Sequence, residues 1–311
     1  MNSSSISNPP GASFPGAQAP NRTRTVEAYG VRLAVYEWGE AHAKPLLLAH
    51  GGFDFARTFD VFAPLLAAGG YRVVSWDHRG HGDSEHAELY SWQADERDLL
   101  AVANSVSPGP LPVVGHSKGG AMLLHIIQAL PHRFSYFASI DGLPFRQSLP
   151  DVANRERTTK MREKVVDWLE HERKAHEMIR KPGTPEELAK RRARMNPRLS
   201  QEWLHYLVFQ GAKQADDGWR WKIDPALKMG GFGPWRARWA TDRLPGLSIP
   251  LLALFGTENE PMGWGADPDG LSRYMPPRSR IEVLKDVGHF LHIEQPRECA
   301  ELILEFLGET V

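Results

Sequence analysis

One serine in this 311-residue chain lies in a sequence that would make it a nucleophile. Residues 115–119 read Gly-His-Ser-Lys-Gly, with Ser117 at the centre, and they follow the apolar run Leu-Pro-Val-Val at 111–114. A strand that turns sharply into a helix needs glycines beside the turn, because the neighbouring segments come too close for side chains. The spacing therefore predicts that Ser117 stands at the apex of a strand–turn–helix element.

A serine hydroxyl is a weak nucleophile at its ordinary pKa, so this motif requires a histidine to take its proton and a carboxylate to support that histidine. Among 13 histidines, His289 fits by position, since it follows a glycine after the last predicted strand and precedes the final predicted helix. We interpret His116 and His125, beside the serine, as packing or hydrogen-bonding residues.

The elements that must position these residues alternate between apolar strands and amphipathic helices. This pattern predicts an α/β fold with a mostly parallel central sheet and helices on both faces. The expected strands are 23–29, 31–38, 44–49, 71–76, 111–114, 134–140, 248–255 and 281–287, and the expected helices are 57–68, 92–106, one after Ser117, and 297–307.

The alternation stops in the middle of the chain. Residues 143–246 are charged, rich in helix formers and rich in tryptophan, so we expect a helical cap inserted into a single domain. The α/β core is then formed by residues 23–142 and 247–311. Residues 1–22 contain almost no large apolar side chains and are expected to form a disordered tail.

Composition excludes several classes of function. Lys and Arg number 37 against 38 Asp and Glu, so there is no electrostatic footprint for nucleic acid. No apolar run approaches the roughly 20 residues that cross a bilayer, and the first residues lack the pattern of a signal peptide. A single cysteine, Cys299, fits a reducing compartment. We expect a cytoplasmic protein without nucleic-acid or membrane partners.

Three motifs follow predicted strands, and ligands bind outside the carboxyl ends of such strands. They are the His-Gly-Gly sequence at 50–52, the serine motif at 115–119 and the Gly-His-Phe sequence at 288–290. With these motifs in this order, the chain from about residue 23 onward, apart from the cap, resembles the α/β-hydrolase family. The resemblance implies that Ser117 is the nucleophile and His289 the base, with no cofactor required.

The same resemblance and the chemistry of acyl transfer place the oxyanion hole at two backbone N–H groups. The expected donors are those of Lys118 and Gly52, with Phe53 as the alternative to Gly52.

The carboxylate departs from the pattern of the family. Most members place an aspartate three residues after the glycine that ends the penultimate strand, and here Asn259 holds that position after Gly256. Glu260 is one substitute, since its longer arm absorbs a shift of one residue. Asp141, after the strand that follows the serine helix, matches the position used by some branches of the family. Both alternatives stay open, and Glu258 ranks behind them.

Two charged segments have a structural interpretation. Residues 77–83 contain two histidines and two aspartates, but no third group of ligands accompanies them, so we interpret this segment as a turn and not a metal site. The arginines at 191, 192, 194 and 198 are interpreted as a solvated helix face.

Seven of the ten tryptophans lie between residues 168 and 264. Such a concentration favours an aromatic pocket above Ser117 for a bulky hydrophobic small molecule. The residues that we expect to line it are Phe53, Trp221, Trp235 and Phe290.

These observations lead to one main hypothesis and two alternatives. The main one is a serine hydrolase that cleaves a carboxylic ester or lactone of a bulky hydrophobic substrate through an acyl-enzyme. The first alternative uses the same three groups to hydrolyse a carbon–carbon bond next to a ketone. The second is a ligand-sensing protein that keeps the fold with little turnover. Epoxide hydrolases and dehalogenases of this family need a carboxylate where Ser117 stands.

Overall fold

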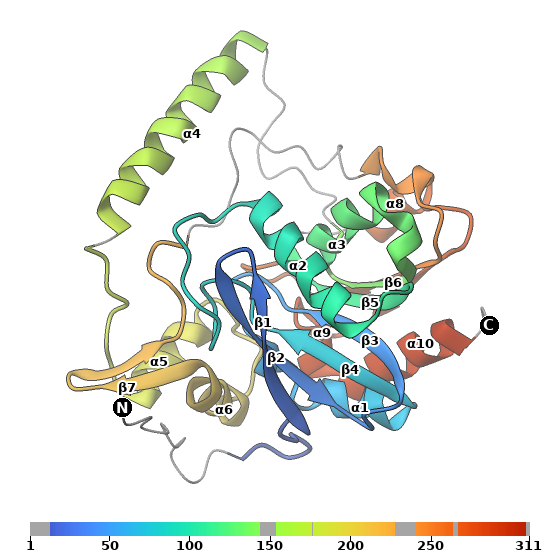
Figure 1. The fold of residues 1–311 in the computed structure, drawn as a ribbon, viewed down its shortest axis with the longest axis horizontal. Helices are drawn as coiled ribbons and strands as arrows, with labels where there is room; N and C mark the ends of the chain where they lie inside the picture. The colour runs from blue at the N-terminus through green and yellow to red at the C-terminus, as the bar shows by residue number, and fades with distance from the viewer. Residues whose placement is uncertain (1–12, 144–153, 176, 228–240, 264–266, 309–311) are drawn as a thin grey trace.

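The computed structural model describes residues 13–143, 154–175, 177–227, 241–263 and 267–308 (Figure 1). Its centre is an eight-stranded sheet with the spatial order β1-β2-β4-β3-β5-β6-β9-β10. The strands are β1 (Arg22–Ala28), β2 (Val31–Trp38), β3 (Lys44–Ala49), β4 (Tyr71–Trp76), β5 (Leu111–His116), β6 (Phe134–Ile140), β9 (Leu251–Gly256) and β10 (Ser279–Leu284).

The sheet is mostly parallel, as predicted. Only β1 with β2 and β2 with β4 pair antiparallel, whereas the neighbours from β4 to β10 all run in one direction. The carboxyl ends of β3, β5, β6, β9 and β10 therefore meet at one edge of the sheet, where the predicted site residues follow them.

Helices cover both faces of the sheet (Figure 1). One apolar layer joins the strands to α2, α3 and α8, and the other joins them to α1, α9 and α10. This confirms the predicted fold class. The helices are α1 (Phe62–Ala68), α2 (Trp92–Val106), α3 (Lys118–Ala129), α8 (Pro268–Ser272), α9 (Leu291–Glu294) and α10 (Pro296–Gly308).

The chain between β6 and β9 forms a separate group of elements. They are α4 (Asn154–Ala175), α5 (Pro185–Ala193), α6 (Gln201–Gly211) and a hairpin of β7 (Ala212–Ala215) and β8 (Gly218–Trp221). Helices α5 and α6 pack around their own apolar centre, which includes Trp203 and Leu204, whereas α4 stands apart from the other helices (Figure 1). The hairpin is an element that the sequence pattern did not indicate. Below, "cap" denotes these elements.

The expected helix at 57–68 is wrong as a single element. A short 3₁₀ turn at Ala56–Phe59 precedes α1, and Asp60 lies between the two. The Asp60 carboxylate accepts a hydrogen bond from Arg57 Nε at 2.7 Å and another from the Tyr206 hydroxyl in the cap. The bond from Tyr206 therefore connects the junction between the 3₁₀ turn and α1 to the cap.

Two other boundaries also differ from the expectation. The segment 14–21 is not a disordered tail, because Phe14 packs edge-on against Trp203, with ring centroids 4.5 Å apart, and Gln18 accepts a hydrogen bond from Trp38 Nε1 at 3.0 Å. Residues 1–12 lie outside the described part of the chain. The last strand ends at Leu284, since Asp286 has a φ of 59° and turns the chain.

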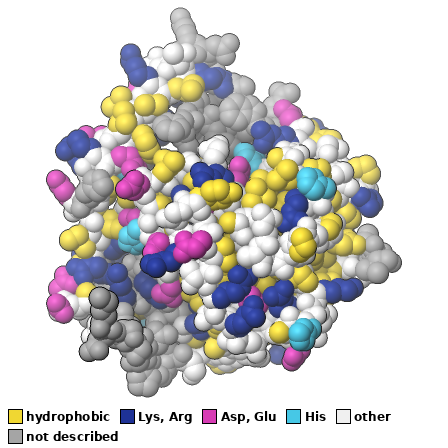
Figure 2. All heavy atoms as spheres, in the orientation of Figure 1, with side chains coloured by type: hydrophobic (Ala, Val, Ile, Leu, Met, Phe, Trp, Pro, Cys, Tyr) yellow, Lys and Arg dark blue, Asp and Glu magenta, His cyan; other side chains and the backbone are white. Residues whose placement is uncertain are grey.

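Charged side chains of both signs are interspersed over the face shown in Figure 2. This agrees with the net charge of −1. Among the described residues, no helix has the length and apolar character needed to cross a membrane.

Candidate active site

Ser117 occupies a strained turn between β5 and α3. Its backbone has φ 51° and ψ −121°, a combination that costs of order 1–3 kcal/mol and persists only where surrounding structure imposes it. The surroundings here are backbone: a Cβ on Gly115 would lie 2.6 Å from the nitrogen of Gly120, and one on Gly119 would lie 2.5 Å from the carbonyl oxygen of Ala49. The two motif glycines thus let α3 lie directly against the sheet, as the sequence predicted.

The helix that follows the serine directs an N–H group at the turn. Lys118 is the first residue of α3, and within the described residues its backbone N–H has no hydrogen-bond partner. Its side chain is held away by an ion pair of 2.6 Å to Asp95 on α2. The free N–H and the positive end of the helix dipole suit a developing oxyanion beside Ser117.

The loop after β10 brings His289 to His116, the residue before Ser117. The His116 Nε2–H donates to the carbonyl oxygen of His289 at 3.0 Å, and the two imidazole rings lie 4.7 Å apart. His116, next to Ser117, therefore joins the serine turn to the histidine loop. This confirms the expectation that His116 is a hydrogen-bonding residue; His125 likewise bonds Glu96 at 3.1 Å.

The loop of His289 crosses the end of β9 at close range. A Cβ on Gly256, the last residue of that strand, would lie 2.6 Å from the carbonyl oxygen of Gly288. The N–H of Glu258 also donates to the carbonyl oxygen of Val287 at 2.9 Å. A side chain at position 256 would push this loop outward and take His289 with it.

Of the two open carboxylates, Asp141 contacts the imidazole ring. Its Oδ2 is hydrogen-bonded to His289 Nδ1, which requires the proton on Nδ1 and leaves Nε2 as the acceptor. Asp141 follows β6 directly, is only 8% exposed, and has a φ of 40°. Aspartate adopts such a positive φ more readily than most residues that carry a side chain, so Asp141 suits this position.

Glu260 contacts the same histidine at a different atom. Its Oε2 accepts the backbone N–H of His289 at 2.6 Å, and burial raises the pKa of this carboxyl. The adjacent N–H, that of Gly288, donates to Glu294 at 2.9 Å. Two glutamates therefore hold consecutive N–H groups of the histidine loop, while Asn259 and Glu258 are exposed.

The N–H of Gly52, the second predicted oxyanion donor, is oriented by His50. The Nδ1–H of His50 donates to the carbonyl oxygen of Gly51 at 2.7 Å, and the Nε2 of His50 accepts the N–H of His78 at 2.9 Å. In a trans peptide the C=O and N–H point in opposite directions. Binding the Gly51 carbonyl therefore directs the Gly52 N–H away from His50, and within the described residues this N–H has no partner.

The N–H of Phe53, the alternative donor, is already engaged. It donates to Nε2 of His81 at 3.2 Å, and the Nδ1–H of His81 donates to the carbonyl oxygen of Arg79 at 2.9 Å. The geometry thus favours Gly52 over Phe53 as the donor. His81 was not among the residues singled out from the sequence, and only its place in the 77–83 turn pointed to it.

That turn is built around a buried carboxylate. Asp77 accepts N–H groups from Ala56 at 2.7 Å and Asp83 at 2.8 Å and the hydroxyl of Tyr36 at 3.0 Å. Burial raises the pKa of Asp77 to about 6. Among the described residues no group of three or more His, Cys, Asp or Glu side chains is arranged to hold a metal ion.

Arg192 does not form part of the solvated helix face that was expected, and Arg198 is exposed but lies between α5 and α6. Arg192 is 12% exposed and reaches the core, where its Nη1 donates to the carbonyl oxygen of Phe53 at 2.9 Å. Arg198 binds Glu294 at 2.7 Å and the carbonyl oxygen of Asp286. Sequence alone could not distinguish Arg192 from the other arginines of this segment.

The aromatic residues expected above Ser117 are separated in the structure. The Phe290 ring is 3% exposed and packs against His116 and His289, with ring centroids 4.9 and 5.2 Å apart. Phe53 is partly exposed, and Trp235 lies outside the described residues.

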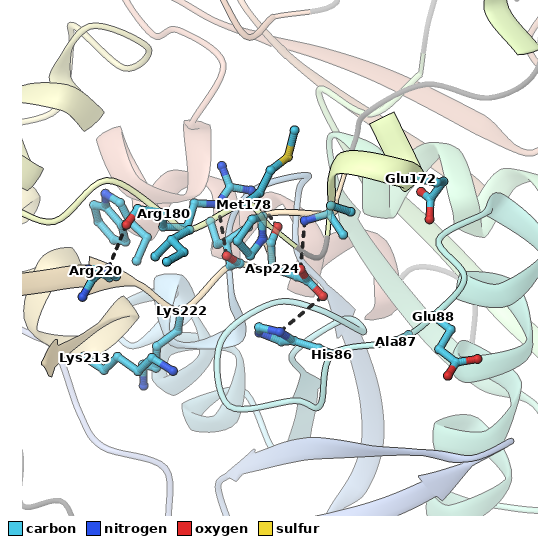
Figure 3. A pocket seen from close by; sticks show the side chains of 16 residues that line it. His86, Ala87, Glu88, Glu172, Met178, Arg180, Lys213, Arg220, Lys222 and Asp224 are labelled. Carbon is cyan, nitrogen blue, oxygen red and sulfur yellow. Dashed lines mark hydrogen bonds and ion pairs between the residues drawn. The ribbon is translucent and has the colours of Figure 1, made fainter. Parts of the chain in front are cut away.

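Trp221 lines a cavity of about 530 Å³ that none of the candidate catalytic residues borders. In this cavity Lys213, Arg220 and Lys222 lie at one side and Glu88 and Glu172 at the other (Figure 3). The cavity thus lies between the cap and the core segment 86–88, and Trp221 lines it without Ser117, His289 or Asp141.

Known proteins share the sequence pattern over much of the chain. A serine hydrolase-like protein of Danio rerio is 24% identical over 279 residues, which cover 87% of this chain and 83% of that protein. Epoxide hydrolase A of Mycobacterium tuberculosis is 34% identical over 139 residues, 43% of each chain.

A solved structure shares the fold. The thioesterase domain from the curacin biosynthetic pathway superposes with a TM-score of 0.77 at 22% identity, covering 91% of this chain and 99% of that domain. The sequence pattern of the family described as "Alpha/beta hydrolase family" matches residues 46–302, from β3 into α10. On this match, the chain belongs to the α/β-hydrolase family.

Proposed function

We propose that this protein is a serine hydrolase that cleaves a carboxylic ester or a lactone of a bulky hydrophobic molecule. The observation that carries the proposal is the hydrogen bond between His289 Nδ1 and Asp141, beside a strained Ser117. A buried Asp–His pair next to an elbow serine has the composition and order of a catalytic triad.

In the proposed reaction Ser117 Oγ adds to the substrate carbonyl carbon while its proton moves to His289 Nε2. The carbonyl oxygen becomes an oxyanion that accepts the N–H groups of Gly52 and Lys118. Collapse of this intermediate expels the alcohol, which takes the proton from His289, and leaves an acyl-enzyme. Water then adds to the acyl carbon by the same steps in reverse and releases the acid. Asp141 stabilises the imidazolium in both halves.

The partial likeness to an epoxide hydrolase does not favour epoxide opening. That chemistry needs a carboxylate at the nucleophile position, and position 117 is a serine. The Asp–His pair also suits carbon–carbon cleavage, but no contact among the described residues of the site favours a diketone over an ester.

The test is a panel of p-nitrophenyl esters of increasing acyl length, aliphatic and aromatic lactones, and a β-diketone, each with Ser117→Ala as the control. We expect turnover of esters or lactones that rises with acyl size and falls to background in the alanine variant. Because alanine removes only Oγ, the variant should keep the wild-type unfolding temperature. Turnover that is unchanged in Ser117→Ala, or confined to the β-diketone, contradicts the proposal.

A further inference from the structure

The cap contacts the loop of the candidate oxyanion hole through one arginine. Arg192, on α5, donates from Nη1 to the carbonyl oxygen of Phe53 at 2.9 Å, and its Nη2 lies 3.3 Å from Oδ1 of Asp54. Asp54 is 1% exposed, and burial raises the pKa of its carboxyl while Arg192 opposes that rise. If either Arg192 or Asp54 moved, the other would be left as a buried charge without its partner. The ion pair therefore restricts the position of α5 relative to the loop at residues 51–54.

The residue that Arg192 holds has a costly backbone conformation. Phe53 has a φ of 57°, in the left-handed region that bulky residues such as phenylalanine seldom occupy. Its N–H is bound by His81 in the core, and its C=O is bound by Arg192 in the cap. The two bonds fix the peptides on both sides of Phe53, and the Gly52 N–H is one residue earlier.

The same guanidinium also faces the loop of the base. Its central carbon lies 5.7 Å from the centroid of the Phe290 ring, within the range of a cation–π contact. Phe290 follows His289 in the chain, and their rings are 5.2 Å apart. One cap side chain thus contacts the neighbours of both the oxyanion donor and the base.

We propose that Arg192 is a positioning residue for the oxyanion hole. Its guanidinium keeps residues 51–54 in the conformation that directs the Gly52 N–H at the substrate carbonyl oxygen, so the stabilisation of the transition state depends on the docking of α5. Arg192 acts through Phe53 and Asp54 and does not touch the reacting atoms. The inference rests on the proposed serine hydrolase function.

The neighbouring arginine supplies a matched control. Arg191 also donates to carbonyl oxygens, those of Lys181 and Pro182 at 2.8 Å each, but both belong to the cap. Comparing Arg192→Met with Arg191→Met therefore separates a cap–core contact from a contact within the cap. Each substitution removes one positive charge from the same helix and keeps a long apolar side chain.

Steady-state kinetics with the best ester of the panel is the first measurement. We expect Arg192→Met to lower kcat about 10- to 100-fold with KM changed less than about threefold, since a misplaced oxyanion donor weakens binding of the transition state more than that of the substrate. Arg191→Met should stay within about twofold of wild type. Arg192→Lys should recover part of the loss, because an ammonium can hold one of the two partners but not both.

A second measurement distinguishes positioning from support of the fold. An arylboronic acid adds to Ser117 Oγ, the serine proton passes to His289, and a boronate oxygen enters the oxyanion hole. Its affinity should fall in Arg192→Met in parallel with kcat. The double variant Asp54→Asn with Arg192→Met removes the carboxylate that the single variant leaves buried, so it should restore the unfolding temperature without restoring kcat.

These experiments distinguish a failure of the inference about Arg192 from a failure of the proposed function. If wild type shows Ser117-dependent turnover but Arg192→Met matches Arg191→Met in kcat and boronate affinity, the inference is wrong and the proposed function stands. A rise in KM alone would also overturn it, since Arg192 would then bind substrate directly. If wild type shows no Ser117-dependent turnover, the proposed function fails and the inference falls with it.

Discussion

His289 Nδ1 is hydrogen-bonded to Oδ2 of Asp141, a residue 148 positions earlier in the chain. The bond spans the sheet from the end of β6 to the loop after β10, with β9 between them. Glu260, which follows β9, is nearer in sequence but contacts only the backbone N–H of His289. Asp141 therefore supports the imidazole ring of His289, and Glu260 supports the backbone of the loop that carries it.

The first prediction concerns the carboxylate that supports the imidazole ring of His289. Asp141→Asn should lower kcat by about three to four orders of magnitude, because an amide cannot stabilise the imidazolium and can hold the wrong tautomer. Steady-state rates on the best ester, with circular dichroism to check the fold, measure this. Activity within tenfold of wild type would show that Asp141 is not the acid.

The second prediction concerns the loop. Glu260→Gln should keep activity within about fivefold, since the amide oxygen still accepts the His289 N–H. Glu260→Ala leaves that buried N–H without a partner and should lower the free energy of unfolding by about 1–3 kcal/mol. Urea unfolding of both variants makes the comparison. A kcat lost in Glu260→Gln as completely as in Asp141→Asn would reverse the two assignments.

The third prediction concerns the serine turn. Gly119→Ala should lower the free energy of unfolding by about 3 kcal/mol, because its Cβ would lie 2.5 Å from the Ala49 carbonyl oxygen and backbone must move. Gly246→Ala is the control, since a Cβ there meets nothing within 4 Å. Equal denaturation midpoints for the two variants would contradict this description of the turn.

The fourth prediction concerns pH. Five buried histidines have a lowered pKa because burial disfavours their charged form; it falls to about 3 for His50 and His292 and well below the usual 6.5 for His78, His81 and His116. The folded state keeps these rings neutral, whereas the unfolded chain binds protons near pH 6.5. Their contribution to stability is therefore complete above about pH 6.5 and is lost as the pH falls toward the folded values.

His292 offers the simplest test of that pH dependence. Within the described residues neither of its ring nitrogens has a hydrogen-bond partner, so His292→Leu removes a proton site without breaking a bond. Between pH 8 and pH 5 the loss of unfolding free energy should shrink by about 2 kcal/mol relative to wild type. The exposed His42, changed to leucine, should leave the loss unchanged. An equal loss of unfolding free energy in wild type, His292→Leu and His42→Leu would show that the pKa of His292 is not lowered in the folded state.

Much of the core could be predicted because its strands are buried on both faces. Lys44–Ala49 and Phe134–Ile140 match the expected strands, because continuous apolar runs are typical of strands in parallel sheets that are covered on both faces. Ser117 follows from the same logic, because it stands directly after β5, whereas His289 lies in the loop after the edge strand β10.

The acid and the cap contacts could not be predicted in this way. Asp141 and Glu260 both follow strands, and only the three-dimensional path of the 287–289 loop gives one the ring and the other the backbone. Arg191 and Arg192 are identical in type and adjacent, yet about 100° of helix rotation directs one into the cap and the other to the core. The residue types in α5 do not indicate which face of this helix contacts the loop at Phe53, which lies far away in the sequence.

The place of the cap in the chain also has a consequence for synthesis. Strand β6 ends at Ile140, and its partner β9 begins only at Leu251, so the ribosome makes the whole cap before that edge of the sheet can be paired. At 5–20 residues per second this leaves the edge of β6 that faces β9 unpaired for roughly 5 to 20 seconds. Throughout that time the nascent chain carries Ser117 but lacks His289, so under the proposed mechanism it cannot turn over substrate until the loop after its last strand has emerged.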